Sequence, residues 1–272
     1  MKLSISNLAW RKEEQDKAAD ILARMNLRGI EIAPAEIWAD PSRFGQLSVS
    51  SLARYWYKYH IAVVSLQGIL FAKPEFNLFG DSQMRRDLYS YCTRMIHLAC
   101  SLGARIIVFG SPKNKQRGIV PYDEAVSIAG DFFTRLGNVA KEDGVYICLE
   151  PTPTVYHTDF LTTTKETLDF LRSVHHPYIR LNLDTSSLAL TKEHIHDVIR
   201  LAAPYIKHVH ISETDFGPIR HGQIPHKEVA KALCDIGYSD WLNIEMIRAD
   251  AMSNISAIRS AIQYVQTVYS SL

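Results

Sequence analysis

The sequence predicts an α/β fold, a single (β/α)8 TIM barrel that occupies residues 1–272 as one domain. Short β-branched apolar runs alternate with amphipathic segments from one end of the chain to the other. No linker or low-complexity segment interrupts this alternation. The length of 272 residues suits the prediction, because such barrels run to about 250 residues as one unit.

The predicted strands are apolar and nearly continuous, rather than strictly alternating between apolar and polar residues. This pattern is typical of parallel strands that helices cover. The strands are expected at residues 2–7, 28–33, 61–67, 105–109, 145–149, 179–183, 206–211 and 241–245.

Helices are expected between the strands, because apolar residues recur there with helical spacing, most clearly over 88–99, 229–236 and 255–269. Thr163 and Glu166 predict a capping box, and Gly103 and Gly237 predict helix ends. A doubly wound open sheet is the alternative fold. It would usually carry a glycine-rich phosphate turn after the first strand, and NLAWRK is not such a turn.

Composition excludes several classes of protein. The net charge of +1 provides no global field that would draw the chain onto nucleic acid or a membrane. No apolar run approaches the ~18 residues of a membrane span, and the first residues do not form an export signal. The four cysteines form no CxxC pair, which favours core thiols in a reducing compartment. We therefore expect a cytoplasmic protein with a small-molecule substrate, and a homo-oligomer remains open.

The one basic cluster is Lys113, Lys115 and Arg117 in SPKNKQRG. We interpret it as a solvated loop. Contact with a phosphate or acid group of a substrate is the alternative.

Metal-ligating side chains stand at the ends of four consecutive predicted strands. Glu150 ends the fifth strand, Asp184 the sixth and Glu245 the eighth, and His210 lies near the end of the seventh. In barrel enzymes the carboxyl ends of the strands carry the catalytic groups. Three carboxylates and one imidazole form an oxygen-rich set that suits a divalent metal ion. We expect Mn²⁺ as the cofactor, with Mg²⁺, Co²⁺ or Zn²⁺ as alternatives.

Each of these residues also has a purely structural interpretation. Asp184 is equally well placed to be a helix N-cap, and Glu150 precedes a proline, as suits many strand ends. His208 is expected to be a hydrogen-bonded core residue, and His226 to lie at a helix start. A structural interpretation does not explain why ligand-type residues end four consecutive strands.

With these residues in this order, the chain resembles the xylose isomerase-like TIM-barrel superfamily, the sugar phosphate isomerase/epimerase group. The resemblance spans the whole chain. It rests on GIEIAP at 29–34, LEPTPT around Glu150, LDTSS around Asp184, HVHISE around His210, HGQIPH at 221–226 and GYSDWLNIEM ending near Glu245.

The resemblance implies that Glu150, Asp184, His210 and Glu245 are the metal ligands, and that Glu150 and Glu245 are an acid/base pair. It implies an isomerase or epimerase of a sugar, sugar phosphate or related polyol that works through a metal-stabilised enediolate. A metal-dependent dehydratase acting on a polyol or keto-cyclitol is the alternative. An endonuclease IV-like nuclease and a non-catalytic binding barrel are less favoured.

The chain departs from the ketose epimerase pattern at three positions. Ser187 stands where these epimerases have a histidine, Phe216 where they have an arginine and Tyr156 where they have a second glutamate. These departures leave the superfamily resemblance intact and leave the substrate open.

Further residues are expected around the mouth of the barrel, where aromatic rings can stack on a sugar. Packing of these rings against helices is the alternative. The predicted substrate contacts are Trp10, Glu31, Gln67, Phe71, Phe216, Arg220 and His221. Lys113 and Arg248 are candidates for binding a phosphate or carboxylate.

Overall fold

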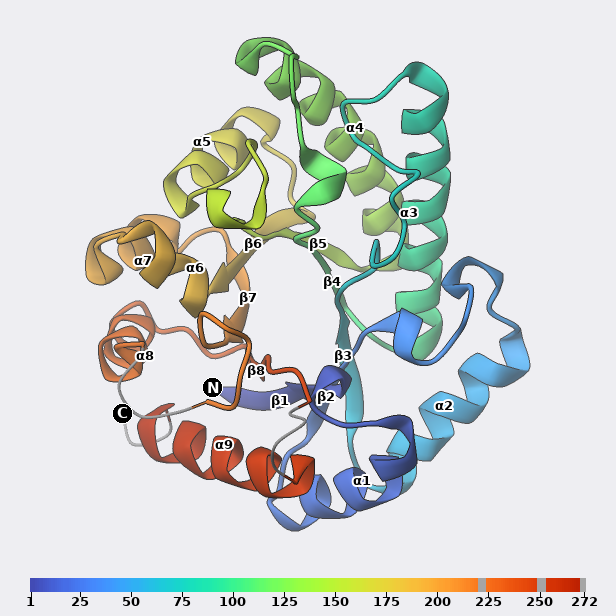
Figure 1. The fold of residues 1–272 in the computed structure, drawn as a ribbon, viewed down its shortest axis with the longest axis vertical. Coiled ribbons are helices and arrows are strands. Elements are labelled where there is room, and N and C mark those ends of the chain that lie inside the picture. Colours follow the sequence, from blue (N-terminus) through green and yellow to red (C-terminus); the bar gives the residue numbers. More distant parts are fainter. Residues whose placement is uncertain (220–223, 249–252, 270–272) are drawn as a thin grey trace.

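The computed structural model describes residues 1–219, 224–248 and 253–269, which form a closed parallel barrel (Figure 1). The strands follow one another around the ring in chain order, and the last pairs with the first. They are β1 (Lys2–Ser6), β2 (Gly29–Ile32), β3 (Ala62–Leu66), β4 (Ile106–Phe109), β5 (Tyr146–Leu149), β6 (Ile179–Asp184), β7 (Ile206–Ile211) and β8 (Trp241–Ile244). The predicted fold class is therefore confirmed, and each strand lies where the apolar runs predicted it.

The α-helices form an outer ring around the strands (Figure 1). They are α1 (Gln15–Arg24), α2 (Gln46–Lys58), α3 (Ser82–Leu102), α4 (Tyr122–Asp143), α5 (Thr164–Val174), α6 (Thr185–Thr191), α7 (Ile195–Ala202), α8 (His226–Asp235) and α9 (Asn254–Tyr269). Short 3-10 helices lie in the loops: η1 (Asn7–Ala9), η2 (Lys12–Glu14), η3 (Pro34–Glu36), η4 (Pro41–Arg43), η5 (Lys113–Lys115) and η6 (Thr154–Tyr156). Within the described ranges, no helix has both the length and the apolar character needed to cross a lipid bilayer.

The predicted helix ends have clear physical causes. Thr163 caps α5, because its hydroxyl accepts a hydrogen bond from the Glu166 N–H at 3.0 Å. The Glu166 carboxylate accepts from the N–H groups of Leu161 and Thr162, at 2.9 and 2.7 Å, instead of from the Thr163 N–H. Gly103 ends α3 in the left-handed region with φ 81°, which a residue without a Cβ adopts readily.

The main apolar core lies between the strands and the surrounding helices. The interior of the barrel is more polar, and a small separate cluster of Ile106, Val108 and Cys148 fills one side of it. On the other side, Ser4 Oγ donates a hydrogen bond to Asn243 Oδ1 at 3.0 Å. Hydrogen bonding satisfies such groups, so the interior can hold polar side chains below the mouth.

A register shift in β6 positions the functional end of the barrel. The pairing of β6 with β7 slips between Leu181 and Asn182, and Asp184 then lies directly opposite His210. His210 in turn lies opposite Asn243 of β8. Because side chains alternate along a strand, this register directs Asp184 and His210 to the same side of the sheet.

Candidate metal centre

Four ligand-type side chains meet at the carboxyl ends of β5 to β8. One ligand atom from each of Glu150, Asp184, His210 and Glu245 lies within 4.8 Å of the others. His210 Nδ1 is 3.0 Å from Glu150 Oε1 and 3.1 Å from Glu245 Oε2. We refer to these residues as the four-residue cluster.

Backbone pairing fixes the two glutamates of the cluster just beyond their strands. The Glu150 N–H donates to the carbonyl oxygen of Phe109 at 3.1 Å, which continues the pairing of β4 with β5. The Glu245 N–H donates to the carbonyl oxygen of Ile211 at 2.9 Å, which continues the pairing of β7 with β8. The backbone of both residues is therefore held by the sheet rather than by a free loop.

Asp184 has two roles at once. Its Oδ1 accepts hydrogen bonds from the Ser187 N–H at 2.6 Å and from Ser186 Oγ at 2.7 Å, so Asp184 is the N-cap of α6. Its Oδ2 accepts from Ser212 Oγ at 2.5 Å. The helix-cap interpretation is thus correct, and it does not exclude ligation. The capping contacts hold the carboxylate rigidly inside the cluster.

Three groups hold Glu150 in place. Asn182 Nδ2 donates to Glu150 Oε1 at 2.6 Å, and Lys115 Nζ donates to the Glu150 carbonyl oxygen at 2.8 Å. The Glu150 carboxylate also lies against the backbone of Gly110, where a Cβ would overlap its Oε2. Glycine is therefore required at the end of β4 for the carboxylate to adopt this position.

Asp184 and Glu245 are buried, Glu150 is partly buried, and the three carboxylates repel one another. Burial raises the pKa of Asp184, and the charge of Glu150 raises it further. Burial also raises the pKa of Glu245 to about 7; His210 opposes this shift, whereas Glu150 and Asp184 add to it. Such a group of acids is stabilised by a cation among them.

His210 fits a metal ligand. Burial would lower the pKa of its imidazole, but the charges of Glu31 and Glu245 outweigh burial and raise the pKa well above its usual value. Its Nδ1 has no hydrogen-bond partner in the described part of the chain, although two carboxylates lie about 3 Å away. Ligand atoms bound at about 2.0–2.2 Å to one ion lie about 3 Å from one another. The cluster therefore suits a divalent metal ion that takes the place of the imidazole proton.

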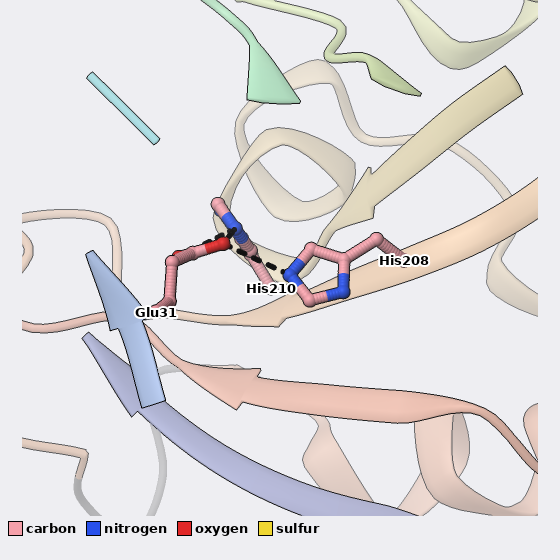
Figure 2. Close-up of side chains that lie close together, drawn as sticks. All are labelled: Glu31, His208 and His210. Atoms are coloured by element: carbon pink, nitrogen blue, oxygen red, sulfur yellow. Dashed lines mark hydrogen bonds and ion pairs between the residues drawn. The ribbon is translucent and has the colours of Figure 1, made fainter. Parts of the chain in front are cut away.

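Behind His210 lies a fully buried carboxylate, Glu31, at the end of β2 (Figure 2). His210 Nε2 lies 3.1 Å from Glu31 Oε1, and His208 Nε2 lies 3.0 Å from Oε2. Asn243 Nδ2 donates to Glu31 Oε1 at 2.5 Å. Burial alone would raise the pKa of Glu31, but the charge of His210 and the hydrogen bonds from both histidines together lower it. A charged Glu31 accepts the Nε2–H of His210, which leaves Nδ1 facing the four-residue cluster.

A cavity of about 660 Å³ opens above the cluster. Glu150, Asp184 and Glu245 form part of its wall. Of the predicted substrate contacts, Gln67, Phe71 and Phe216 line this cavity. Lys113, a candidate for binding a phosphate or carboxylate, lines it too.

Three other residues that were predicted to contact the substrate do not line the cavity. Trp10 is 2% exposed and packs edge-on against Trp56, with ring centroids 6.2 Å apart, so it belongs to the core. Glu31 lies below His210 rather than in the cavity wall. Arg248 forms an ion pair with Glu36 at 3.0 Å and is not part of the lining either.

Arg220 and His221, the two remaining predicted contacts, lie outside the described residues. His226 begins α8, as predicted. His208 is buried and hydrogen-bonded to Glu31, as predicted for a core histidine.

Sequence reasoning missed three residues that shape the centre: Gly110, Lys115 and Asn182. Asn182 has a recognisable signal, because it lies two residues before Asp184 and therefore on the same face of β6. Gly110 directly follows β4, just as Glu150 directly follows β5 and Glu245 directly follows β8. Lys115 gave no such signal, because a lysine in a polar loop is usually solvated.

Comparisons with known proteins find similar sequences and similar folds. A family model described as xylose isomerase-like TIM barrel matches residues 19–268. The D-psicose 3-epimerase of Ruminiclostridium cellulolyticum is 29% identical over 126 residues, which cover 44% of this chain and 43% of that protein. The match thus spans less than half the length of that relative.

Two solved structures share the fold over nearly the whole chain. The D-psicose 3-epimerase of Clostridium cellulolyticum H10, solved with D-tagatose, superimposes with a TM-score of 0.84 at 18% identity and covers 99% of both chains. The structure of an L-ribulose 3-epimerase gives a TM-score of 0.85 at 19% identity and covers 100% of this chain and 95% of that one. At this level of identity the likeness concerns the fold.

Proposed function

The chain belongs to the xylose isomerase-like TIM-barrel family, and we propose that it is a divalent-metal-dependent isomerase or epimerase of a sugar or related polyol. One observation carries the proposal. Glu150 and Glu245 come from β5 and β8, both contact His210 Nδ1, and both line the same cavity. This arrangement offers a site for an ion and two bases beside one substrate.

The residues Glu150, Asp184, His210 and Glu245 would hold the ion, and their oxygen-rich composition favours Mn²⁺ or Mg²⁺. A bound divalent ion would supply positive charge to stabilise the oxyanion that develops when a proton leaves the carbon beside a carbonyl group. Asn182 and the serine contacts of Asp184 orient the carboxylates, so that little reorganisation accompanies the reaction.

Each glutamate has one oxygen near His210 Nδ1, namely Glu150 Oε1 and Glu245 Oε2. The second oxygen of each carboxylate is available to exchange a proton with the substrate. One glutamate removes the proton from the carbon next to the carbonyl, and the other returns a proton. Return to the opposite face of the same carbon inverts the stereocentre, whereas return to the neighbouring carbon gives an isomer.

Exchange of the substrate proton with solvent deuterium tests the proposal. Protein loaded with Mn²⁺ is incubated in heavy water with D-psicose or L-ribulose, the sugars in the names of the relatives, and the sugar is analysed by mass spectrometry. We expect deuterium to enter the sugar with the wild type. Glu245→Gln should slow the exchange by about 10²-fold or more, because it removes a general base and a ligand. Glu142→Gln, at an exposed position of α4, is the matched control and should exchange normally.

Measuring the metal content of each variant shows whether slower exchange comes from loss of the ion or from loss of the base. Inductively coupled plasma mass spectrometry on each variant should find the ion reduced in Glu150→Gln/Asp184→Asn and retained in Glu142→Gln. Exchange that persists in Glu245→Gln would contradict the assigned role. Products that have lost water would instead favour the dehydratase alternative, which uses the same ion and base.

A further inference from the structure

The cavity above the four-residue cluster is larger than a simple sugar requires. Its volume is about 660 Å³, and a water molecule in the liquid occupies about 30 Å³. A hexose of about a dozen non-hydrogen atoms fills at most about half of this space, even at the share of volume that water takes per atom. The cavity therefore has room for more than the hexose itself.

Part of the cavity wall is apolar. Phe71 and Ile247 line the cavity and are 70% and 48% exposed, so they present uncovered apolar surface. The rings of Tyr156 and Phe216 pack together with centroids 5.9 Å apart, and both line the cavity. The Tyr156 hydroxyl donates to the Thr214 carbonyl oxygen at 3.2 Å. We call Phe71, Tyr156, Phe216 and Ile247 the apolar wall.

The backbone holds Phe216 in this wall in an unusual conformation. Its φ is 54°, in the left-handed region that a bulky residue rarely adopts. Two hydrogen bonds maintain it: the Phe216 N–H donates to the Glu213 carbonyl oxygen at 2.9 Å, and the Ile247 N–H donates to the Phe216 carbonyl oxygen at 2.8 Å. Strained conformations of this kind concentrate where a side chain contacts a ligand.

The charges in the described part of the cavity wall do not favour an anionic substituent. Among the described residues that line it, the cations are Lys73 and Lys113. Lys73 Nζ lies 3.9 Å from Asp40 Oδ1 and 3.7 Å from Glu75 Oε1, so its charge is balanced. One remaining lysine without a bidentate arginine is a weak site for a phosphate.

From these observations we propose that the substrate is an uncharged sugar or cyclitol with an apolar substituent on the end away from the reacting carbon. The apolar wall binds the substituent while the four-residue cluster holds the reacting end. This inference rests on the proposed function, because it assumes that the reacting end lies at the cluster. Burial of an aromatic or alkyl group against exposed rings favours binding through the hydrophobic effect.

Three sugars with the same reacting end test the inference: D-psicose, 6-O-benzyl-D-psicose and D-psicose 6-phosphate. The kcat/KM for solvent-proton exchange is measured for each with the Mn²⁺-loaded protein. We expect the benzyl derivative to exceed D-psicose by about tenfold or more, and the phosphate to show no such gain. Equal values for the first two sugars, or the highest value for the phosphate, would overturn the inference.

Two variants test whether the higher kcat/KM of the benzyl derivative depends on the apolar wall. Phe216→Asn removes the ring at a left-handed position that asparagine tolerates, so the protein should fold with an unchanged or higher melting temperature. In this variant, and in Phe71→Ser, the benzyl advantage should fall below about threefold. Leu47→Asn is the control, because Leu47 is an 84% exposed apolar residue of α2 outside the cavity, and it should keep the full advantage.

Failure of the proposed function gives a different result from failure of the inference about the apolar wall. If no sugar exchanges its proton although the ion is bound, the function is contradicted, and calorimetric affinities of the three sugars then decide the inference by themselves. Tighter binding of the benzyl derivative that Phe216→Asn abolishes would support the apolar site. Equal affinities would exclude it.

Discussion

Glu31 and His210 lie side by side inside the barrel, with His210 Nε2 3.1 Å from Glu31 Oε1 (Figure 2). Both side chains are fully buried. The contact orients the imidazole so that its other nitrogen, Nδ1, faces the carboxylates of Glu150 and Glu245. A carboxylate behind a histidine in this way fixes its tautomer and raises its basicity toward a metal ion.

Replacing Glu31 by glutamine should therefore weaken metal binding without removing a ligand. The amide keeps the shape of the side chain but loses the negative charge that holds both histidines as donors. We expect the dissociation constant for Mn²⁺, measured by calorimetry, to rise by about 10–100-fold. Glu36→Gln is the matched control, since Glu36 pairs with Arg248 away from the cluster. An unchanged constant in Glu31→Gln would show that the buried carboxylate is only structural.

Metal binding should also stabilise the fold through Asp184. Asparagine at this position still caps α6 but lacks the charge that a cation requires. A ligand at 100 times its dissociation constant stabilises a protein by about 2.7 kcal/mol. We therefore expect Mn²⁺ to raise the melting temperature of the wild type and to leave that of Asp184→Asn nearly unchanged.

The control for this experiment is another helix cap. Asp81 caps α3 through a 2.8 Å hydrogen bond from the Met84 N–H, outside the four-residue cluster. Asp81→Asn should respond to Mn²⁺ like the wild type. A similar rise in Asp184→Asn would mean that the ion binds elsewhere.

Gly110 should be intolerant of a side chain because Glu150 occupies the space of its Cβ. In Gly110→Ala the methyl group displaces the carboxylate of Glu150. A shift of about 1 Å in a catalytic group can cost about 10²-fold in rate, so we expect a loss of this order in the rate of solvent-proton exchange. Gly130→Ala is the control, since a Cβ at this position of α4 meets no atom within 4 Å. It should keep full activity and gain about 0.5–1 kcal/mol in stability. Full activity in Gly110→Ala would show that Glu150 can move without consequence.

The sequence predicted the order of the strands and the residues that end them, because both follow from short apolar runs of regular spacing. The convergence of Glu150, Asp184, His210 and Glu245 is a consequence of this order, since the carboxyl ends of parallel strands meet at one end of a barrel.

The depth of a side chain in the barrel depends on the stagger between strands, which the sequence does not reveal. Glu31 was expected at the mouth, but it lies opposite Ser6 and Ser65, next to a register shift in β2, and this places it below His210. Lys115 was expected in a solvated loop, but it is 1% exposed. Its ammonium group contacts the carbonyl oxygens of Glu150 and Leu161, at 2.8 and 3.5 Å, from loops that are distant in sequence. Such tertiary contacts overrode the local pattern.

His226 should make the stability of the fold sensitive to acid. It begins α8, is 1% exposed, and its Nδ1 forms a hydrogen bond of 2.9 Å with the Tyr269 hydroxyl. Glu213 Oε1 lies 3.6 Å from its Nε2, too far for a hydrogen bond. Burial lowers the pKa of His226 from 6.5 to about 4.

The sign of the effect follows from the protons bound by each state. Between pH 6.5 and 4 the unfolded chain binds a proton at His226 and the folded chain does not, so the free energy of unfolding falls as the pH falls. Across this range the loss attributable to His226 approaches about 3 kcal/mol. Urea unfolding of metal-free protein at pH 7 and pH 4.5 measures it. His226→Gln should lose less stability on acidification than the wild type, whereas His194→Gln, at an exposed position, should match the wild type. An identical loss in His226→Gln would mean that other groups control the acid sensitivity, and that His226 is protonated in the folded chain without penalty.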